Sequence, residues 1–274
     1  VLNAAKKIAS VLRKGNLVII ESTSPVNTTN KVLSLLSNES GLDINDFHLC
    51  YCPERVLPGN IINELKNNDR VIGGLTKNAS RAACNLYSSF CRGKLIETNS
   101  ECAELVKLSE NSYRDINIAF ANELSIICEK LGIDIIELIS IANHHPRVNI
   151  LKPGCGVGGH CIAVDPYFIV SAFPGDSLLV QSAREVNNKK NLWVRSKIME
   201  KVKNFELENN RKPIVGCLGL SFKPNIDDLR ESPALKIFNY LNECNLDVVA
   251  CEPNLKKHSS IKLYSLEDIK LKAD

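Results

Sequence analysis

The sequence contains no long hydrophobic run, no excess of charge of one sign and no CxxC cysteine pair. Its longest apolar stretches are short, such as Leu17–Ile20 and Ile162–Val164, so we expect no membrane-spanning segment and no signal peptide. With 34 Lys and Arg against 31 Asp and Glu, the formal net charge is only +3, which argues against nucleic acid as a partner.

Cysteine is nevertheless abundant, with eleven residues at scattered spacings. An odd number of thiols cannot pair completely within one chain, and their spacing does not match a zinc module. We therefore expect reduced cysteines and a cytoplasmic location. A composition of 44% hydrophobic and 24% charged residues is that of an ordinary globular protein, and 274 residues are enough for more than one domain.

Residues 1–99 alternate between helical and strand patterns. This alternation predicts a parallel sheet covered on both faces by helices. Because the chain opens at Val1 with a helical pattern and no strand before it, we expect residues 1–99 to be the C-terminal half of a doubly wound domain. The helices are expected at 2–13, 28–37 and 79–90, and the strands at 17–20, 47–52, 70–75 and 94–97.

Two further regions follow. Residues 100–211 are predicted to form an all-helical domain, with long helices at 101–131 and 177–206, a shorter one at 135–143 and an irregular block at 146–166. Residues 212–274 return to alternation, with strands at 213–220 and 246–251 around a helix at 232–244. The predicted fold class is therefore α/β: a partial Rossmann-like parallel sheet domain, a central all-helical domain and the start of a second Rossmann-like domain.

The segment Pro153–Cys161 contains four glycines, and Gly154, Gly156 and Gly159 formally match GxGxxG. A dinucleotide phosphate loop needs a strand before it and a helix directly after it, and Pro166 argues against an early helix. We therefore favour a tight glycine turn that carries a nucleophilic thiolate at Cys161, because reactive thiols need polar surroundings. For the other ten cysteines we favour a structural role.

Three other groups have simple structural explanations as well as functional ones. Lys107, Asn111 and Arg114 share one helix face, and by spacing alone this is a solvated face with Glu104–Lys107 and Glu110–Arg114 ion pairs. Neither the histidines at 144–145 nor the thiols at 50 and 52 have enough ligands for a metal site. Lys223 and Arg230 either bind an anionic phosphate or pair with the aspartates at 227–228.

Taken together, the motifs resemble the UDP-glucose/GDP-mannose dehydrogenase family of nucleotide-sugar 6-dehydrogenases. The likeness covers nearly the whole chain, in the order Glu21–Pro25, Cys52–Gly59, Arg70–Gly74, Lys107–Asn111, Gly156–Cys161 and Gly219–Lys223. The longer strings Asn111–Glu123, His145–Leu151 and Phe222–Pro233 look most like the UDP-N-acetyl-D-mannosamine branch of this family.

The resemblance implies an enzyme that uses two NAD⁺ to oxidise the C6 hydroxymethyl group of a UDP-sugar to a carboxylate. Cys161 would be the nucleophile, Lys107 the general acid and base, Asn111 an oxyanion donor and Asp165 the group that orients the lysine or the water. Substrate contacts are implied for Arg55, Val56, Lys107, Asn111, Arg114, His145, Arg147, Gly158 and Lys223, and cofactor contacts for Thr23 and Arg230. No metal is implied.

The resemblance also implies that residues 1–99 are the C-terminal half of an NAD-binding domain, residues 100–211 a central all-helical dimerisation domain and residues 212–274 a truncated UDP-sugar-binding domain. We expect a homodimer through the helices at 101–131 and 177–206, with His145 and Arg147 reaching a neighbouring subunit's site. We expect a central fragment, because family members begin with a glycine-rich NAD-binding unit and continue beyond Asp274. The leading substrate is UDP-N-acetyl-D-mannosamine, and the alternative within the same enzyme class is another UDP-sugar, UDP-N-acetylglucosamine or UDP-glucose. A second alternative, from a different class, is a non-catalytic fragment that binds nucleotide sugar and dimerises.

The chain departs from the family pattern at three positions. Asn27 replaces a glycine in the loop after Thr23, and Cys155 stands where proline is usual, which places a second thiol near Cys161. Pro58 replaces an acidic residue of the UDP-glucose members, which argues against glucose as the sugar.

Overall fold

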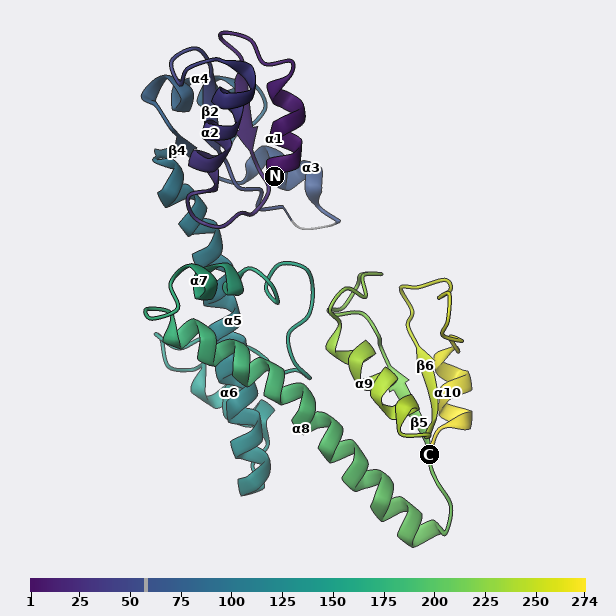
Figure 1. The fold of residues 1–274 in the computed structure, drawn as a ribbon. Coiled ribbons are helices and arrows are strands. Elements are labelled where there is room, and N and C mark those ends of the chain that lie inside the picture. The colour runs from purple at the N-terminus through teal and green to yellow at the C-terminus, as the bar shows by residue number, and fades with distance from the viewer. Residues whose placement is uncertain (57–58) are drawn as a thin grey trace. The chain divides into compact units, whose positions relative to one another are not determined.

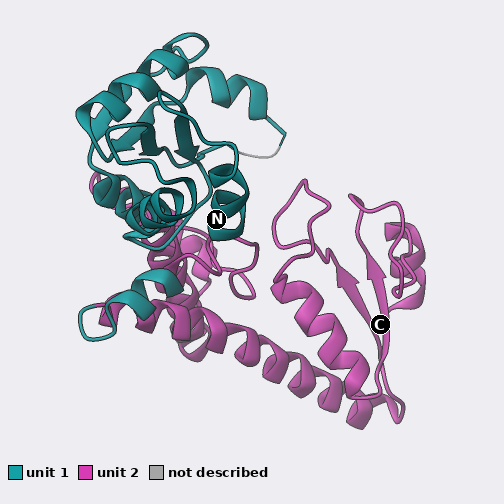
Figure 2. Cartoon of the chain, turned by 45° about the horizontal axis from the view of Figure 1, so that its top comes forward, with its two compact units in different colours: residues 1–110, 167–176 teal, residues 111–166, 177–274 magenta. Residues whose placement is uncertain are grey.

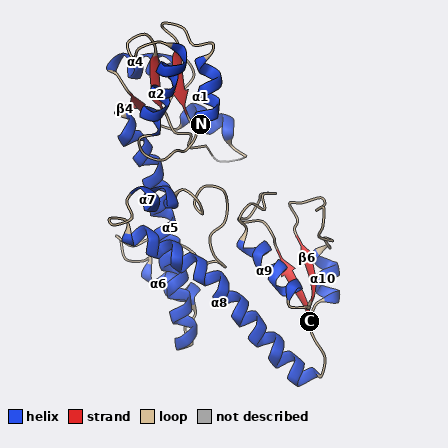
Figure 3. Ribbon diagram, viewed as in Figure 1, coloured by secondary structure: helices blue, strands red, loops and turns tan. Residues whose placement is uncertain are grey.

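The computed structural model describes residues 1–56 and 59–274, and Pro58, on which the argument against glucose rests, lies outside them. Figure 1 follows the chain by colour from its N-terminus to its C-terminus, and Figure 3 distinguishes helices from strands. They are α1 (Leu2–Ala9), β1 (Leu17–Ile20), α2 (Thr28–Ser40), β2 (His48–Tyr51), α3 (Ile61–Asn67), β3 (Arg70–Gly74), α4 (Lys77–Ser88), β4 (Leu95–Thr98), α5 (Ser100–Leu131), α6 (Ile135–Ala142), α7 (Pro166–Ala172), α8 (Leu178–Asn209), β5 (Ile214–Leu218), α9 (Pro233–Glu243), β6 (Asp247–Cys251) and α10 (Leu266–Lys272).

The chain forms two compact units (Figure 2). Unit 1 contains residues 1–110 and 167–176, and unit 2 contains residues 111–166 and 177–274. Helix α5 is continuous and contributes to both units. The three-domain division given above stays a prediction, because these units are defined by packing alone.

The sheet of unit 1 has the strand order β1-β2-β3-β4. Strands β1 and β2 are parallel, as are β3 and β4, but β2 and β3 pair antiparallel through Cys50–Gly74 and Tyr51–Gly73. The predicted α/β class is confirmed, and this one pair differs from the expected all-parallel sheet. A buried strand has the same apolar pattern in either direction, so its sequence does not reveal which way it runs.

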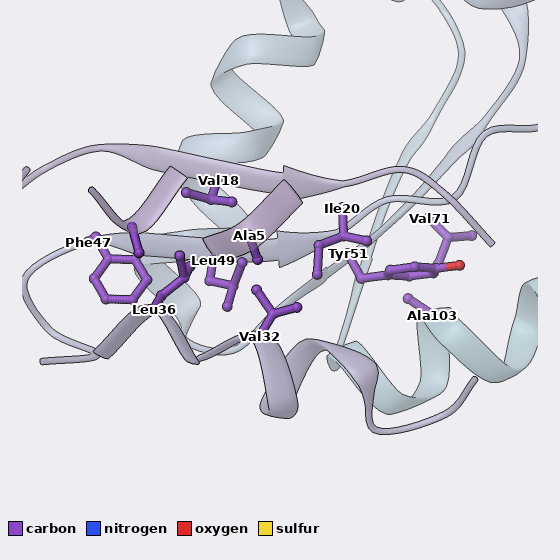
Figure 4. Packing of buried hydrophobic residues seen from close by; sticks show 11 residues of the cluster. Ala5, Val18, Ile20, Val32, Leu36, Phe47, Leu49, Tyr51, Val71 and Ala103 are labelled. Carbon is purple, nitrogen blue, oxygen red and sulfur yellow. The ribbon is translucent and has the colours of Figure 1, made fainter. Parts of the chain in front are cut away.

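A core of apolar side chains joins α1 and α2 to this sheet (Figure 4). Val18 and Ile20 lie two residues apart on β1 and therefore share one face, which they present together with Leu49 from β2. On α2, Val32 and Leu36 are four residues apart and only 1% and 0% exposed. Burial of each such side chain stabilises the unit by about 2 kcal/mol.

In unit 2, the long helices α5 and α8 are linked by buried polar side chains. Asp115 on α5 lies 2.7 Å from the guanidinium of Arg184 on α8, and Asn122 donates to Asn187 at 2.8 Å. The second sheet is a parallel pair, β5 and β6, connected by α9. Helix α9 begins with Pro233 at its first turn, and the side chain of Ser232 caps it by accepting from the N–H of Leu235.

Several helices were not predicted. Pro166 does not block a helix but begins α7, because a proline at the first helical position lacks only an N–H that has no partner within the helix. The short helices α3 and α10 have seven residues each, too few for a clear helical period. Within residues 1–56 and 59–274, no helix is both long and apolar enough to cross a membrane.

Candidate functional site

The loop of Cys161 leads into α7 through a tight turn. The carbonyl oxygen of Cys161 accepts hydrogen bonds from the N–H groups of Val164 at 2.9 Å and Asp165 at 2.8 Å. Cys161 itself is partly exposed, whereas Asp165 is 4% exposed. The turn therefore carries an accessible thiol and, four residues later, a buried carboxylate.

Asn111 on α5 meets this buried carboxylate. Its side-chain amide nitrogen lies 2.5 Å from Oδ2 of Asp165, and Asn111 is 7% exposed. The structure thus brings together three predicted residues of unit 2: Asn111, Cys161 and Asp165. The spacing of the sequence could place Asn111 on a helix face, but only the fold places this face beside the cysteine turn.

The glycines before Cys161 allow close packing against the second sheet region. A Cβ atom on Gly158 would lie 2.7 Å from the carbonyl oxygen of Glu231 and from Cβ of Phe222. The N–H of Gly159 donates to the carbonyl of Arg230 at 3.0 Å, and Gly159 has a φ of +87°. No strand lies between α6 and this loop, all of which the structure describes, so the loop is not a Rossmann phosphate loop.

Arg230, predicted to contact the cofactor, is engaged by a carboxylate of its own loop. Its Nε lies 3.0 Å from both oxygens of Asp228, and a second guanidinium nitrogen lies 2.6 Å from Oδ2. This hydrogen bonding lowers the pKa of Asp228 to about 2. His160 Nδ1 also lies 3.7 Å from Asp228. Pairing with an aspartate, one of the two alternatives given above, therefore holds for Arg230.

Lys223 is partly buried in the loop that follows β5. Glu252, directly after β6, holds the start of this loop, because one of its oxygens accepts from the N–H groups of Leu220 and Ser221, each at 2.8 Å. Glu252 is 5% exposed. These backbone hydrogen bonds outweigh the effect of burial and lower the pKa of Glu252.

In unit 1, Arg55 and Val56 follow β2 at its carboxyl end. Their N–H groups donate to Oε1 of Glu54 at 2.6 Å and 3.1 Å. The guanidinium of Arg55 forms an ion pair with Glu110 on α5. Both predicted binding residues are therefore held by carboxylates to which the sequence analysis gave no part in the site.

The face of α5 around Lys107 is not a solvated helix face. Glu104 is fully buried and accepts from the N–H groups of Asn27 at 2.5 Å and Thr29 at 2.7 Å. Glu110 pairs with Arg55 instead of Arg114. The surface ion pairs expected from spacing are therefore wrong, and Lys107 is partly buried.

The remaining predicted binding residues lie on exposed surface. Arg114, His145 and Arg147 are all exposed, and the N–H of Arg147 approaches Nδ1 of His145 at 3.4 Å. In the part of the chain that the structure describes, no group of three or more metal-ligating side chains occurs. No disulfide joins any of the eleven cysteines, all of which the structure describes. Burial raises the pKa of Cys155.

Unit 1 fits a dinucleotide at one position and not at another. Thr23 is partly exposed in the loop after β1, at the carboxyl edge where α/β sheets bind ligands. The N-terminus of α2 would be a second phosphate position, but the Glu104 carboxylate already occupies it. Asn27 precedes α2 with a φ of 72°, the left-handed conformation that a glycine also adopts. The replacement of the family glycine therefore leaves this turn possible.

Comparison with known sequences places all three regions in one family. Residues 1–91 match the NAD binding domain, residues 101–189 the central domain and residues 216–274 the UDP binding domain of the UDP-glucose/GDP-mannose dehydrogenase family.

The relatives are nucleotide-sugar dehydrogenases. The UDP-N-acetyl-D-mannosamine dehydrogenase of Campylobacter jejuni is 52% identical, over 98% of this chain and 67% of that protein. The NDP-N-acetyl-D-galactosaminuronic acid dehydrogenase of Ralstonia solanacearum is 49% identical, over 98% of this chain and 63% of that protein. Among solved structures, the UDP-D-ManNAc dehydrogenase of Pyrococcus horikoshii has a TM-score of 0.90 at 40% identity, over 100% of this chain and 64% of that one. The chain thus spans about two thirds of the length of these relatives.

Proposed function

Since this chain belongs to the UDP-glucose/GDP-mannose dehydrogenase family, we propose that it carries the nucleophile and sugar-binding residues of an NAD-dependent UDP-sugar 6-dehydrogenase. The leading reaction converts UDP-N-acetyl-D-mannosamine to UDP-N-acetyl-D-mannosaminuronate, supported by the 52% identity to the Campylobacter jejuni enzyme. The single observation that carries the proposal is the contact of Asn111 with Asp165 beside the Cys161 turn.

The reaction removes four electrons from the C6 carbon and adds one oxygen from water. Two NAD⁺ molecules accept these electrons as two hydrides, so that one carboxylate and two NADH form for each sugar. Thr23 and Arg230 are the residues of this chain proposed to contact the cofactor. For Arg230 this contact requires release from, or sharing with, the carboxylate of Asp228.

Cys161 divides the oxidation into two easier steps. Its sulfur adds to the C6 aldehyde, which gives a thiohemiacetal, and loss of the second hydride from that carbon leaves a thioester. Water then attacks the thioester carbon, and the thiolate leaves as the sugar carboxylate forms. The partly exposed thiol in a glycine-rich turn gives a substrate carbon access to the sulfur.

Asn111 and Lys107 are proposed to act on the reacting oxygen. The amide nitrogen of Asn111 has two hydrogens; Asp165 accepts one, so that the amide is held in place and the other can donate to the developing oxyanion. Lys107 lies one turn earlier on the same helix and is proposed to remove and return the proton of the C6 hydroxyl. Asp165 acts here by fixing Asn111.

Sugar-nucleotide binding is assigned to residues from several loops. Arg55 and Val56 would contact the substrate from the loop after β2, Gly158 from the glycine turn and Lys223 from the loop after β5. Arg114, His145 and Arg147 are exposed and are proposed to complete binding sites, the two last in a neighbouring copy of the chain.

A homodimer is proposed because α5 leaves a row of large apolar side chains in solvent. Tyr113, Phe120, Ile127 and Leu131 are spaced by seven, seven and four residues, so they share one face, and they are between 45% and 69% exposed. A second copy of this helix is the partner that matches such a row. Sedimentation of the protein as a monomer at micromolar concentration would contradict this part of the proposal.

The activity is tested by NADH formation with the full-length protein and UDP-N-acetylmannosamine, UDP-N-acetylglucosamine or UDP-glucose in parallel. We expect turnover with the mannosamine sugar, lost in Cys161→Ala and kept in the matched variant Cys155→Ala. Turnover with only one of the other two sugars would show that the substrate assignment is wrong and that the proposed type of reaction is right. Binding of UDP-sugars without any NADH would favour the non-catalytic alternative.

A further inference from the structure

The carboxyl ends of β1 and β2 meet a buried guanidinium that no motif assigned to the site. Arg70 begins β3, and its side chain is only 5% exposed. Its two terminal nitrogens lie 3.8 Å from a carboxylate oxygen of Glu21 and 3.8 Å from one of Glu54. The guanidinium carbon also lies 4.5 Å from the centre of the Tyr87 ring. One buried cation therefore faces two carboxylates from neighbouring strand ends.

The carboxylate of Glu54 connects Arg70 to the loop after β2. While Oε2 faces Arg70, Oε1 accepts from the N–H groups of Arg55 and Val56. The orientation of the Glu54 side chain thus fixes the backbone position of the two residues proposed to bind substrate. Rotation of this carboxylate would leave both N–H groups without their acceptor.

Glu21 makes the same connection to the loop after β1. Its carboxylate faces Arg70 and accepts from the hydroxyl of Tyr87 at 2.6 Å, while its carbonyl oxygen accepts from the N–H of Glu54 at 3.1 Å. Thr23 follows two residues later. The strand-end loops of β1 and β2 are therefore joined both through the backbone and through the guanidinium.

We propose that Arg70 is a positioning residue that fixes the loops of Glu21 and Glu54 and thereby sets the place of Arg55 and Val56 for the sugar nucleotide. The effect on binding rests on the proposed function, whereas the effect on the loops does not. A planar guanidinium has donors along two edges and can face both carboxylates while its flat surface stacks on Tyr87. A lysine ammonium in the same place carries the charge without the second edge or the stacking.

The first experiment measures the loops without any ligand. Hydrogen exchange at the amides of Arg55 and Val56 is compared in the full-length native protein, Arg70→Met and Arg70→Lys. We expect at least tenfold faster exchange in Arg70→Met and a smaller increase in Arg70→Lys, with the amides of β1 unchanged. The matched control is Leu36→Ala, which weakens the core of the same unit away from these carboxylates.

The second experiment measures dissociation constants for UDP-N-acetylmannosamine and for UDP alone. We expect Arg70→Met to weaken binding of the sugar nucleotide about tenfold and binding of UDP less than twofold. Leu36→Ala should change neither constant. Tyr87→Phe removes only the hydroxyl and should give a smaller loss of the same kind, which covers the case in which Arg70→Met does not fold.

The outcomes separate this inference from the proposed function. Exchange at Arg55 and Val56 that is unchanged in Arg70→Met, or equally fast in Leu36→Ala, overturns the positioning role, whichever ligand binds. If exchange at Arg55 and Val56 is faster in Arg70→Met but the affinity for the sugar nucleotide is unaltered, Arg70 positions the loops without affecting substrate binding, and that part of the proposal is overturned. If the native protein binds no UDP-sugar, the proposed function fails, and the exchange measurement still decides the role of Arg70 in the loops.

Discussion

The two sheets of this protein hold their first strand-end loop in related ways, with one difference. In each, a buried carboxylate accepts backbone N–H groups of the chain that follows the first strand: Glu104 for the loop after β1 and Glu252 for the loop after β5. Glu252 comes from the adjacent strand end of the same sheet, whereas Glu104 comes from α5, 75 residues from Thr29.

This difference links the first loop, but not the second, to the helix of Lys107 and Asn111. Glu104 lies one turn before Lys107 on α5, so the helix position and the Thr23 loop are set by one carboxylate. The loop of Lys223 is fixed within its own sheet. We therefore expect substitutions on α5 to alter the loop after β1. Substitutions at Glu252 should alter only the loop after β5.

The largest effect is expected for Glu104→Ala. The substitution removes the acceptor of two N–H groups and of the Thr29 hydroxyl at a fully buried position, and we expect a loss of about 3 kcal/mol in the free energy of unfolding of unit 1. Urea unfolding, followed by hydrogen exchange at Asn27 and Thr29, measures it. A loss below about 0.5 kcal/mol would show that water replaces this carboxylate. It would contradict the view that Glu104 holds the loop after β1 as Glu252 holds the loop after β5.

Glu252→Ala is expected to cost less, about 2 kcal/mol, because the loop after β5 keeps other contacts such as the hydrogen bond from Ser221 Oγ to Ile226. Exchange should accelerate at Leu220 and Ser221 and stay unchanged throughout unit 1. Acceleration in unit 1 as well would contradict the local character of this carboxylate.

The contribution of Glu252 also depends on pH. Its pKa is lowered in the folded protein, so its stabilisation is present above the unfolded pKa of about 4.3 and is lost as the pH falls below it. The urea midpoint of the native protein should fall between about pH 5 and pH 3, and that of Glu252→Gln should fall less. Parallel curves for the two proteins would remove Glu252 from this pH dependence.

An effect of similar size is expected where the glycine turn packs on the second sheet region. Gly158→Ala places a methyl group 2.7 Å from backbone and side-chain atoms, which we expect to cost about 1–3 kcal/mol and to displace the Cys161 turn. In the matched control Gly175→Ala the added atom meets nothing within 4 Å. Thermal unfolding of both variants tests this, and equal midpoints would show that the turn yields without strain.

The smallest effect compares one buried thiol of each sheet. Burial raises the pKa of Cys50 on β2 to about 12 and that of Cys217 on β5 to about 11. Both thiols are therefore protonated at pH 8, and iodoacetamide should leave them unmodified while it labels Cys161, with Cys217 reacting before Cys50 as the pH rises. Peptide mass spectrometry gives this order, and early labelling of Cys50 would contradict its burial.

Much of the fold could be predicted from periodicity. The strand at 17–20 and the helix at 135–143 agree with β1 and α6 to within a residue, because their apolar patterns and flanking turn residues are strong. The direction of β3 and the helix that begins at Pro166 were missed. Both features depend on how distant parts of the chain pack together, and the local hydrophobic pattern carries no information about that packing.

Apart from Cys161, which its glycine turn had already indicated, the catalytic residues were assigned through the resemblance. Spacing alone gave Lys107, Asn111 and Arg114 a solvated face, because the contacts that bury this face are distant in sequence. Asn111 contacts Asp165 across 54 residues, and Glu104 contacts Thr29 across 75. Arg70 belongs to a motif of the resemblance that assigns it no role, and Glu252 belongs to none, so each looks like an ordinary charged residue at a strand end. Their burial, at 4% and 5% exposure, is what distinguishes them.

The central claim is that Cys161 carries the sugar during oxidation. The most direct test stops the full-length protein with acid during turnover of UDP-N-acetylmannosamine and NAD⁺ and measures the mass of each cysteine peptide. We expect a nucleotide-sugar adduct on the peptide of Cys161 and none on any other, with no adduct in Cys161→Ala. An adduct on Cys155 or another thiol, or NADH formation that persists in Cys161→Ala, would contradict it.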